Sequence, residues 1–363
     1  MKKIDWYILK KFLTTFFFAI FLFSVIAVAV DISEKADDFV SSGLSTKDII
    51  LKYYMAFVPY IVALLFPLFV FIAVIFFTSK MAVRSEIIAI IASGTSFNRM
   101  MRSYWVGGII LGLLLLFAAN YVIPRAQEKR TAFETNYVNV HSTYDPLHPR
   151  SRNIYFRIDS FTYAGVRNYD TSSKSGGPFF MQRVKNNQMI YNLRSETIRW
   201  DTARKNWLLQ NAIERYINGL NEKVIYAGRK DMSFNFKPFD LSHDEYAKDK
   251  LTTPELKNFI HLEALRGAED LNTLLVEEYR RFATPLAVLI LTIIGAVVAS
   301  RKVRGGSGSH IALGIMLAAA FILMDRFSTI FSTKGNLPPF IAAWIPDIFF
   351  SFVALYLYRK APK

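Results

Sequence analysis

Six apolar stretches, each long enough to cross a lipid bilayer, constrain this chain more than any other feature. A membrane-spanning helix needs roughly 20 consecutive, mainly apolar residues. Three stretches precede a long polar segment and three follow it, which predicts a membrane protein with a 3+3 arrangement and argues strongly against a soluble enzyme. The stretches are Phe12–Val30, Tyr53–Phe77, Tyr104–Ile123, Phe282–Ser300, Ile311–Ile330 and Ile341–Tyr358.

The net charge of +15 is explained by basic residues that are concentrated on one side of the predicted membrane. The short segments on one side of the predicted membrane contain Lys2, Lys3, Lys10, Lys11, Lys80, Arg84, Arg99, Arg102, Arg301, Lys302, Arg304, Arg359, Lys360 and Lys363. The short loops on the other side contain only Lys35, Lys47, Lys52 and Lys334. The positive-inside rule then places both termini in the cytoplasm and the large polar domain outside. Without a basic-aromatic stripe, this charge does not indicate nucleic-acid binding.

Two features of the sequence bear on N-terminal processing and on redox chemistry. Ala27-Val28-Ala29 resembles a signal-peptidase site, but the apolar stretch before it exceeds the roughly 7–15 residues of a signal peptide. We therefore expect an uncleaved first span. The chain has no cysteine, which excludes a disulfide framework and any cysteine-ligated metal site.

Residues 124–281 predict an outer domain of antiparallel strands, arranged as a sandwich or partly open barrel. In Asn153–Phe161 the residues alternate, as in a half-buried strand: Ile154, Phe156 and Ile158 share one face, and Tyr155, Arg157 and Asp159 share the other. A helix should begin at Thr253-Pro254, and two amphipathic helices, broken at Gly267, should lead to Arg280-Arg281 at the outer boundary. The further predicted strands are Phe179–Val184, Met189–Leu193, Thr197–Trp200, Trp207–Ala212 and Lys223–Ala227, with turns at Asn186-Asn187, Asp201–Lys205 and Asn218-Gly219.

The cytoplasmic segment 80–103 predicts a short apolar helix. Isoleucines at positions 87, 88, 90 and 91 give a broad apolar face, and Gly94 is a typical helix terminator. Thr95 or Ser96 should cap a second short helix that contains Arg99 and Arg102. The apolar helix suits a groove on a soluble partner; the alternative is a helix that lies on the lipid surface.

Motifs for intrinsic catalysis are missing from the sequence. It contains no P-loop, no His-Glu-x-x-His zinc motif and no Gly-x-Ser-x-Gly nucleophile elbow, and its five histidines lack metal-ligand spacing. We therefore expect neither an active site, nor a metal, nor a bound cofactor in this chain.

Charged residues near the outer membrane boundary allow two interpretations. Arg326 and Asp347 lie at similar depths in spans five and six, so they could form an ion pair; alternatively, Arg326 could face a cavity and meet an anionic head group. A basic collar of Lys35, Arg125, Lys129 and Arg130 could bind a substrate or simply reach phospholipid phosphates.

The layout and several motifs resemble the lipopolysaccharide-export permease family LptF/LptG over essentially the whole chain, with details closer to LptG. The most specific match is Arg84-Ser85-Glu86 followed by Ala92-Ser93-Gly94, which is similar to the family's coupling segment. The opening Asp5-Trp6-Tyr7-Ile8 is similar to the family's Asp-Arg-Tyr-Ile, with Trp6 as a departure. Pro285-Leu286 and Leu337-Pro338-Pro339 add weaker support.

The resemblance implies a fold and an assembly in the Gram-negative inner membrane. Residues 1–123 would hold helices one to three, 124–281 a periplasmic β-jellyroll with connecting helices, and 282–363 helices four to six. The implied partners are a paralogous permease, the bitopic protein LptC and two copies of the ATPase LptB, which would bind ATP and Mg²⁺. Lipopolysaccharide would be the substrate, bound by Lys35, Arg125, Lys129, Arg130 and Arg326. The implied ATPase-coupling residues are Arg84, Ser85, Glu86, Ile87, Ile88, Ile90, Ile91, Ala92, Ser93 and Gly94.

A different class of function also fits the layout. The chain could be a membrane scaffold or mechanotransmission protein whose outer domain recruits periplasmic partners without moving lipid. A membrane enzyme would need a cluster of titratable residues in one pocket, and the sequence indicates none.

Overall fold

The computed structural model describes residues 2–138, 152–170, 173–234, 236–241, 247–266, 271–301 and 308–361. The chain forms two compact units. The helical unit contains Met1–Val138, Lys248–Leu256 and Asn272–Lys363, and the β unit contains Asn139–Ala247 and Lys257–Leu271. Of the predicted outer domain, 124–281, residues 139–247 and 257–271 form the β unit, while 124–138, 248–256 and 272–281 belong to the helical unit.

Six helices in the described parts of the chain are long and apolar enough to cross a membrane, as predicted. Each extends beyond its apolar stretch at both ends, except that α11 ends one residue before Ser300. The spans are α1 (Lys3–Glu34), the run α3 (Thr46–Ile49), η1 (Ile50–Tyr54) and α4 (Met55–Val83), the run α6 (Phe97–Phe117), η2 (Ala118–Val122), α7 (Ile123–Phe133) and η3 (Glu134–Val138), α11 (Leu271–Ala299), α12 (Gly308–Thr333) and α13 (Pro339–Arg359). Two short helices, α2 (Ala36–Ser41) and α5 (Glu86–Ala92), connect the first three spans.

Two predicted short helices are parts of longer ones. The helix expected after Thr95 begins at Phe97, next to its N-cap Ser96, and continues into span three. The second amphipathic helix expected before span four is the first part of α11. Neither junction contains a proline or glycine that would interrupt the backbone ladder, so the helix continues. The break predicted at Gly267 lies outside the described residues.

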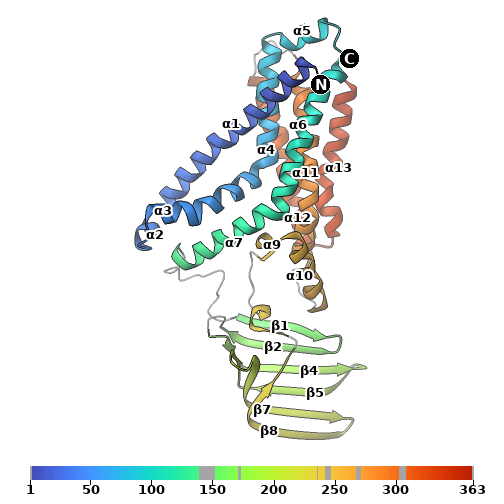
Figure 1. Ribbon diagram of the computed structural model, residues 1–363. Coiled ribbons are helices and arrows are strands. Elements are labelled where there is room, and N and C mark those ends of the chain that lie inside the picture. The colour runs from blue at the N-terminus through green and yellow to red at the C-terminus, as the bar shows by residue number, and fades with distance from the viewer. Residues whose placement is uncertain are drawn as a thin grey trace. The chain divides into compact units, whose positions relative to one another are not determined.

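The N-terminus, α5 and the C-terminus lie at the same end of the helical unit (Figure 1). The connection between α1 and α4, with α2 and α3, lies at the other end. Two crossings separate the N-terminus from α5 and six separate it from the C-terminus, so all three must share one end, whereas the connection after the first span must lie at the other.

Close packing of α6 against α11 depends on two glycines spaced four residues apart. A β-carbon at Gly108 would lie 3.3 Å from the Thr292 hydroxyl, and one at Gly112 would lie 3.0 Å from the Pro285 carbonyl oxygen. Small residues at this spacing let membrane helices approach closely, since lipid supplies no hydrophobic force between them. Accordingly, 72% of the apolar window of α11 is buried, against 6% in α1.

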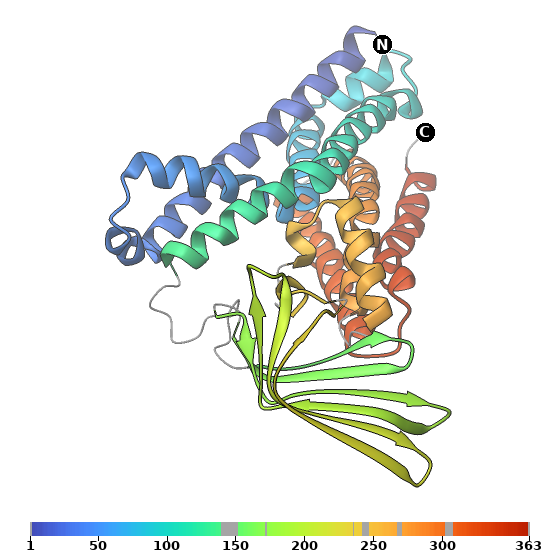
Figure 2. The ribbon, with the colours of Figure 1, turned by 60° about the horizontal axis from the view of Figure 1, so that its bottom comes forward.

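The β unit contains one antiparallel sheet of eight strands, which is open rather than closed into a barrel (Figure 2). β7 pairs along its length with β8 on one side; on the other its first half pairs with β6 and its second half with β5. The strands are β1 (Arg152–Asp159), β2 (Thr162–Tyr169), β3 (Ser175–Gly176), β4 (Phe179–Lys185), β5 (Gln188–Ser195), β6 (Thr197–Asp201), β7 (Asn206–Asn218) and β8 (Asn221–Met232). Short helices α8 (Pro238–Leu241), α9 (Ala247–Lys250) and α10 (Thr253–Arg266) follow.

The predicted strands form, and Ile154, Phe156 and Ile158 pack together against the buried core of the sheet, as expected. β2 and β3 were not predicted. β2 contains Gly165, and its buried residues do not alternate with exposed ones, so it lacks the period-two pattern. The Asn186-Asn187 turn has positive φ at both residues, the conformation that suits a tight hairpin.

The start of α10 is one residue off the prediction. The Glu255 carboxylate accepts hydrogen bonds from both the backbone amide, at 2.8 Å, and the hydroxyl, at 2.6 Å, of Thr252. Thr252, rather than Thr253, is therefore the capping residue. Thr253 is free to make a tertiary contact described below.

Candidate functional site

The predicted apolar cytoplasmic helix forms as α5, between two residues of left-handed backbone. Ser85 precedes it with φ of 61° and Gly94 follows it with φ of 86°. Glycine adopts this conformation without strain, whereas serine does so at a cost of order 1 kcal/mol. Ser85 therefore makes a sharp corner between α4 and α5 that the surrounding contacts must hold.

The Glu86 carboxylate provides one such contact, because it joins α5 to the first turns of α1. Its Oε2 accepts a hydrogen bond from the Tyr7 hydroxyl at 2.9 Å and forms an ion pair with Lys11 Nζ at 3.1 Å. Lys11 Nζ also donates to the Tyr7 hydroxyl. Arg84 is more distant, at 4.0 Å from Oε1. Burial alone raises the pKa of Glu86, but the bonds from Lys11 and Tyr7 outweigh it, so this pKa lies below its ordinary value.

The isoleucine face of α5 points mostly into the helical unit. Ile87 is 3% exposed and belongs to the buried core, and Ile90 and Ile91 pack against that core. Ile88, by contrast, is 52% exposed. A helix of seven residues is unstable alone and needs tertiary packing, which explains why three isoleucines serve the fold.

The outward face of α5 is correspondingly narrow. The exposed residues of segment 84–94 are Arg84, Ile88, Ala89, Ala92, Ser93 and Gly94, while Ser85 and Glu86 are half-buried. The broad apolar face expected for a partner is thus reduced to a patch centred on Ile88.

Sequence reasoning missed Tyr7 and Lys11 as partners of Glu86. Their spacing of four residues places them on one face of α1. Tyr7 belongs to the opening motif noted above, but nothing in the sequence indicates that this motif meets residue 86. The contact spans more than seventy residues along the chain and exists only after α1 packs against α4.

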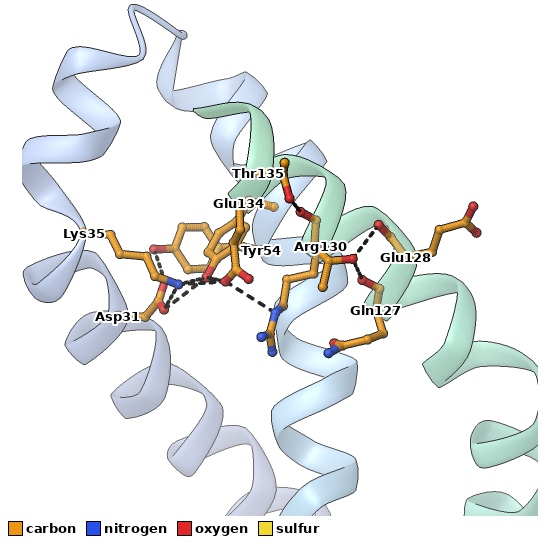
Figure 3. Close-up of polar contacts among 10 residues, drawn as sticks. Asp31, Lys35, Tyr54, Gln127, Glu128, Arg130, Glu134 and Thr135 are labelled. Atoms are coloured by element: carbon orange, nitrogen blue, oxygen red, sulfur yellow. Dashed lines mark hydrogen bonds and ion pairs between the residues drawn. The ribbon is translucent and has the colours of Figure 1, made fainter. Parts of the chain in front are cut away.

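At the opposite end of the helical unit, two of the predicted collar residues belong to a polar network (Figure 3). Lys35 Nζ lies 2.9 Å from Asp31 Oδ1 and 3.0 Å from Glu134 Oε1. The fully buried Tyr53 accepts a bond from Lys35, and its hydroxyl lies 3.1 Å from both carboxylates. Tyr54 donates to Asp31 Oδ2 at 3.0 Å. The network joins α1, η1 and η3.

Arg130 completes the network, whereas Arg125 and Lys129 stay outside it. Arg130 Nε lies 3.4 Å from Glu134, and its guanidinium covers the Tyr60 ring at 4.2 Å. Two cations and two carboxylates balance within the network. Arg125 and Lys129 are exposed on one face of α7 and pair with no described carboxylate. The predicted collar is therefore split into a half-buried pair whose charges are compensated, Lys35 and Arg130, and an exposed cationic pair, Arg125 and Lys129.

The ion pair considered between Arg326 and Asp347 does not form. Arg326 is exposed on α12, while Asp347 is 3% exposed on α13 and its Oδ2 has no hydrogen-bond partner. The neighbouring Asp325 instead pairs with Arg280, whose Nη2 lies 3.0 Å from it. Adjacent helical residues point about 100° apart, so when Asp325 faces α11, Arg326 is turned away.

Arg281, expected at the outer water boundary, is also buried, at 5% exposure. It donates to the Thr253 hydroxyl at 3.1 Å and to the Lys248 carbonyl at 2.8 Å. Thr253 in turn donates to the side chain of Asn120. Arg281 thereby fastens the segment Lys248–Leu256 to α11. Among the described residues, no cluster of histidine and acidic side chains could hold a metal ion.

Comparison with known proteins agrees with this geometry. The family model "Lipopolysaccharide export system permease LptF/LptG" matches residues 6–360. Two proteins named lipopolysaccharide export system permease protein LptG, from Escherichia coli K12 and from Escherichia coli O6:H1, are each 22% identical over 373 aligned residues. Each alignment covers 98% of this chain and 98% of the relative. A match along almost the whole chain includes the spans, the β unit and the α5 segment together, so this chain belongs to the LptF/LptG family of lipopolysaccharide export permeases.

Proposed function

We propose that this chain is the permease subunit of an ATP-driven transporter that extracts lipopolysaccharide from the inner membrane and passes it to a periplasmic bridge. The observation that carries the coupling part of the proposal is the Tyr7–Lys11–Glu86 contact, which links an exposed cytoplasmic helix to a membrane span. ATP and Mg²⁺ would be bound by a partner ATPase. The partners would be two LptB-like ATPase copies, an LptF-like permease and an LptC-like bitopic protein.

The proposed orientation places α5 and both termini in the cytoplasm. These elements share one end of the helical unit (Figure 1), and the basic residues are concentrated in the same segments. The positive-inside rule favours that end as the cytoplasmic one. The chain enters the β unit after Val138, at the end of span three, and finally leaves it before Asn272, at the start of span four, with a short return to the helical unit at Lys248–Leu256. In this orientation the β unit is periplasmic.

Extraction of lipid A chains needs an external energy source. Each buried methylene contributes about 0.8 kcal/mol, so exposing one chain of about ten carbons costs roughly 8 kcal/mol. Several chains per molecule make spontaneous release negligible. ATP hydrolysis in the partner would supply the work, provided that a mechanical connection carries it into the membrane.

The connection would run from α5 to α1. The corner at Ser85 and the buried Ile87 fix α5 to the helical unit, so that α5 moves as part of it. Glu86 then transfers movement to α1, the span with the smallest buried share. Most of the apolar window of α1 is exposed, which suits this span as a movable wall of a lipid cavity shared with the paralogous permease.

Phosphates on the lipopolysaccharide head group would meet the exposed half of the collar. Arg125 and Lys129 are both exposed and can donate charge-assisted hydrogen bonds to phosphate. Arg326 is a further exposed cation on α12. Lys35 and Arg130 would contribute only if the network with Asp31 and Glu134 rearranged, because their charges are already compensated.

Co-purification followed by an extraction assay tests the proposal. The tagged native protein should retain a P-loop ATPase and a second six-span protein in mild detergent. In proteoliposomes, Glu86→Gln should keep ATPase binding but reduce ATP-dependent lipopolysaccharide release. Asp48→Asn, an exposed carboxyl with its own lysine partner, is the matched control. Unchanged release by Glu86→Gln would refute the coupling role, and recovery without an ATPase would favour the scaffold alternative.

A further inference from the structure

A small cavity lies between α1 and α4, beside the Glu86 contact, with which it shares Lys11 and Arg84. Its volume is about 160 Å³. The cavity lining combines three cationic side chains and one hydroxyl with three apolar side chains, and it includes no carboxylate. The lining residues are Lys11, Thr15, Phe76, Phe77, Lys80, Met81 and Arg84.

The order of these residues along the two helices matches the order of parts in a phospholipid. Phe76, Lys80 and Arg84 follow one another at intervals of four residues, so they share one side of α4 and its end. From Phe76 to Arg84 the rise is about 12 Å at 1.5 Å per residue. Phe76 lies within the span, whereas Arg84 comes directly after its end. An acyl chain would thus lie at the level of Phe76, with a phosphate at the level of Lys80 and Arg84.

Positive charge at the cavity exceeds the negative charge that the described residues provide. Glu86 is the carboxylate near it, and it is 3.1 Å from Lys11 but 4.0 Å from Arg84. Lys80 is exposed and forms no ion pair with a described carboxylate. Two cations are therefore available to an anion, together with the Thr15 hydroxyl. Lysine and arginine bind phosphate through short charge-assisted bonds.

The cavity is small, at about 160 Å³, and partly open to its surroundings. It has room for a group the size of a phosphate, and the rest of a larger ligand would lie outside it. The ligand should keep its chains in the bilayer and insert only its phosphate.

We propose that this cavity binds the phosphate of an anionic phospholipid, of the phosphatidylglycerol type, at the membrane surface next to α5. A zwitterionic phospholipid would bring its amine close to three cations and bind less well. The site is separate from the export substrate, which would engage the opposite end of the helical unit, and it does not depend on the proposed export activity. In the proposed orientation it faces the cytoplasmic leaflet, where anionic lipids attract basic residues.

Native mass spectrometry of the purified full-length chain, with added phosphatidylglycerol or phosphatidylcholine, tests the proposal. Lys80→Gln should weaken phosphatidylglycerol binding about tenfold, the loss expected for one charge-assisted contact. Lys80→Arg should retain it. Lys10→Gln is the matched control, since Lys10 is exposed near the same end of α1 but does not line the cavity.

Three results would overturn the proposal. Equal weakening by Lys80→Gln and Lys10→Gln would mean that phosphatidylglycerol responds to general positive charge. Equal binding of phosphatidylcholine and phosphatidylglycerol would remove the preference for an anionic lipid. Displacement of phosphatidylglycerol by millimolar inorganic phosphate would identify a soluble-phosphate site instead of a lipid site.

Discussion

Replacing Lys35 with methionine tests whether the buried polar network stabilises the helical unit or serves the substrate. Lys35 pairs with two carboxylates, Asp31 at 2.9 Å and Glu134 at 3.0 Å, and its side chain is 21% exposed. Removing one partner of a buried pair costs about 3–5 kcal/mol, since the remaining charge is left uncompensated. Arg130 stays beside Glu134, so we expect a loss of about 2–4 kcal/mol in the free energy of unfolding.

Lys52→Met provides the matched control. Lys52 also pairs with an aspartate four residues away, at 3.1 Å from Asp48, but the two side chains are 56% and 43% exposed. An exposed pair of this kind contributes about 0–1 kcal/mol. The two substitutions thus differ in burial while the chemistry and the spacing are the same.

Unfolding of the full-length chain in mixed micelles, driven by increasing SDS and followed by tryptophan fluorescence, measures both losses. A Lys35→Met loss no larger than that of Lys52→Met would refute the stabilising role. A double variant, Lys35→Met with Asp31→Asn, should recover part of the lost stability, because Glu134 then keeps Arg130 as its partner and no charge in the network is left unpaired. If Lys35 served only the substrate, Lys35→Met would reduce lipopolysaccharide binding and leave the unfolding free energy unchanged.

Three further predictions concern other parts of the molecule. Gly112→Ile should destabilise the chain by about 1–3 kcal/mol in the same SDS assay, because a β-carbon there meets the Pro285 carbonyl; an unchanged midpoint would contradict close packing of α6 and α11. Ile87→Ala should cost about 2–4 kcal/mol of stability, whereas Ile88→Ala should leave stability unchanged and weaken ATPase binding in a pull-down; the reverse pattern would refute the assignment of the two faces of α5. Glu214 is buried, which by itself raises its pKa, but Lys230 and two tyrosines hold the pKa below its ordinary value. Its contribution to stability should therefore be present above the ordinary pKa, near 4.5, and disappear as the pH falls below it; a Glu214→Gln variant with the same pH dependence would contradict this.

Much of the candidate coupling site could be predicted from the sequence, because its signals are local. The helix α5 follows from a run of apolar residues between Ser85 and Gly94, and a terminator at Gly94 depends only on glycine's access to positive φ. The partners of Glu86 could not be predicted in this way. Their selection depends on which turn of α1 meets α4, and many pairs of helix positions fit the same hydrophobic pattern.

The charged residues predicted near the outer boundary also show which contacts the sequence could not predict. A count of basic residues at the boundary predicts a cationic collar, and it groups Lys35 and Arg130 with Arg125 and Lys129. The structure places Lys35 and Arg130 against Asp31 and Glu134, which removes half of that collar. Likewise, equal depth in the membrane made Arg326 and Asp347 plausible partners, but depth does not specify the rotation of each helix about its axis.

By itself, the sequence determined the six spans, most of the strands and the position of α5, because transfer of apolar side chains from water and the periodicity of the backbone act within short segments. Tertiary structure alone decided which side chains of those segments meet. It turned three of the four isoleucines of α5 inward and joined Glu86 to Tyr7 and Lys11. Such contacts depend on helix rotation and approach, to which distant glycines such as Gly108 and Gly112 contribute as much as the contacting residues do.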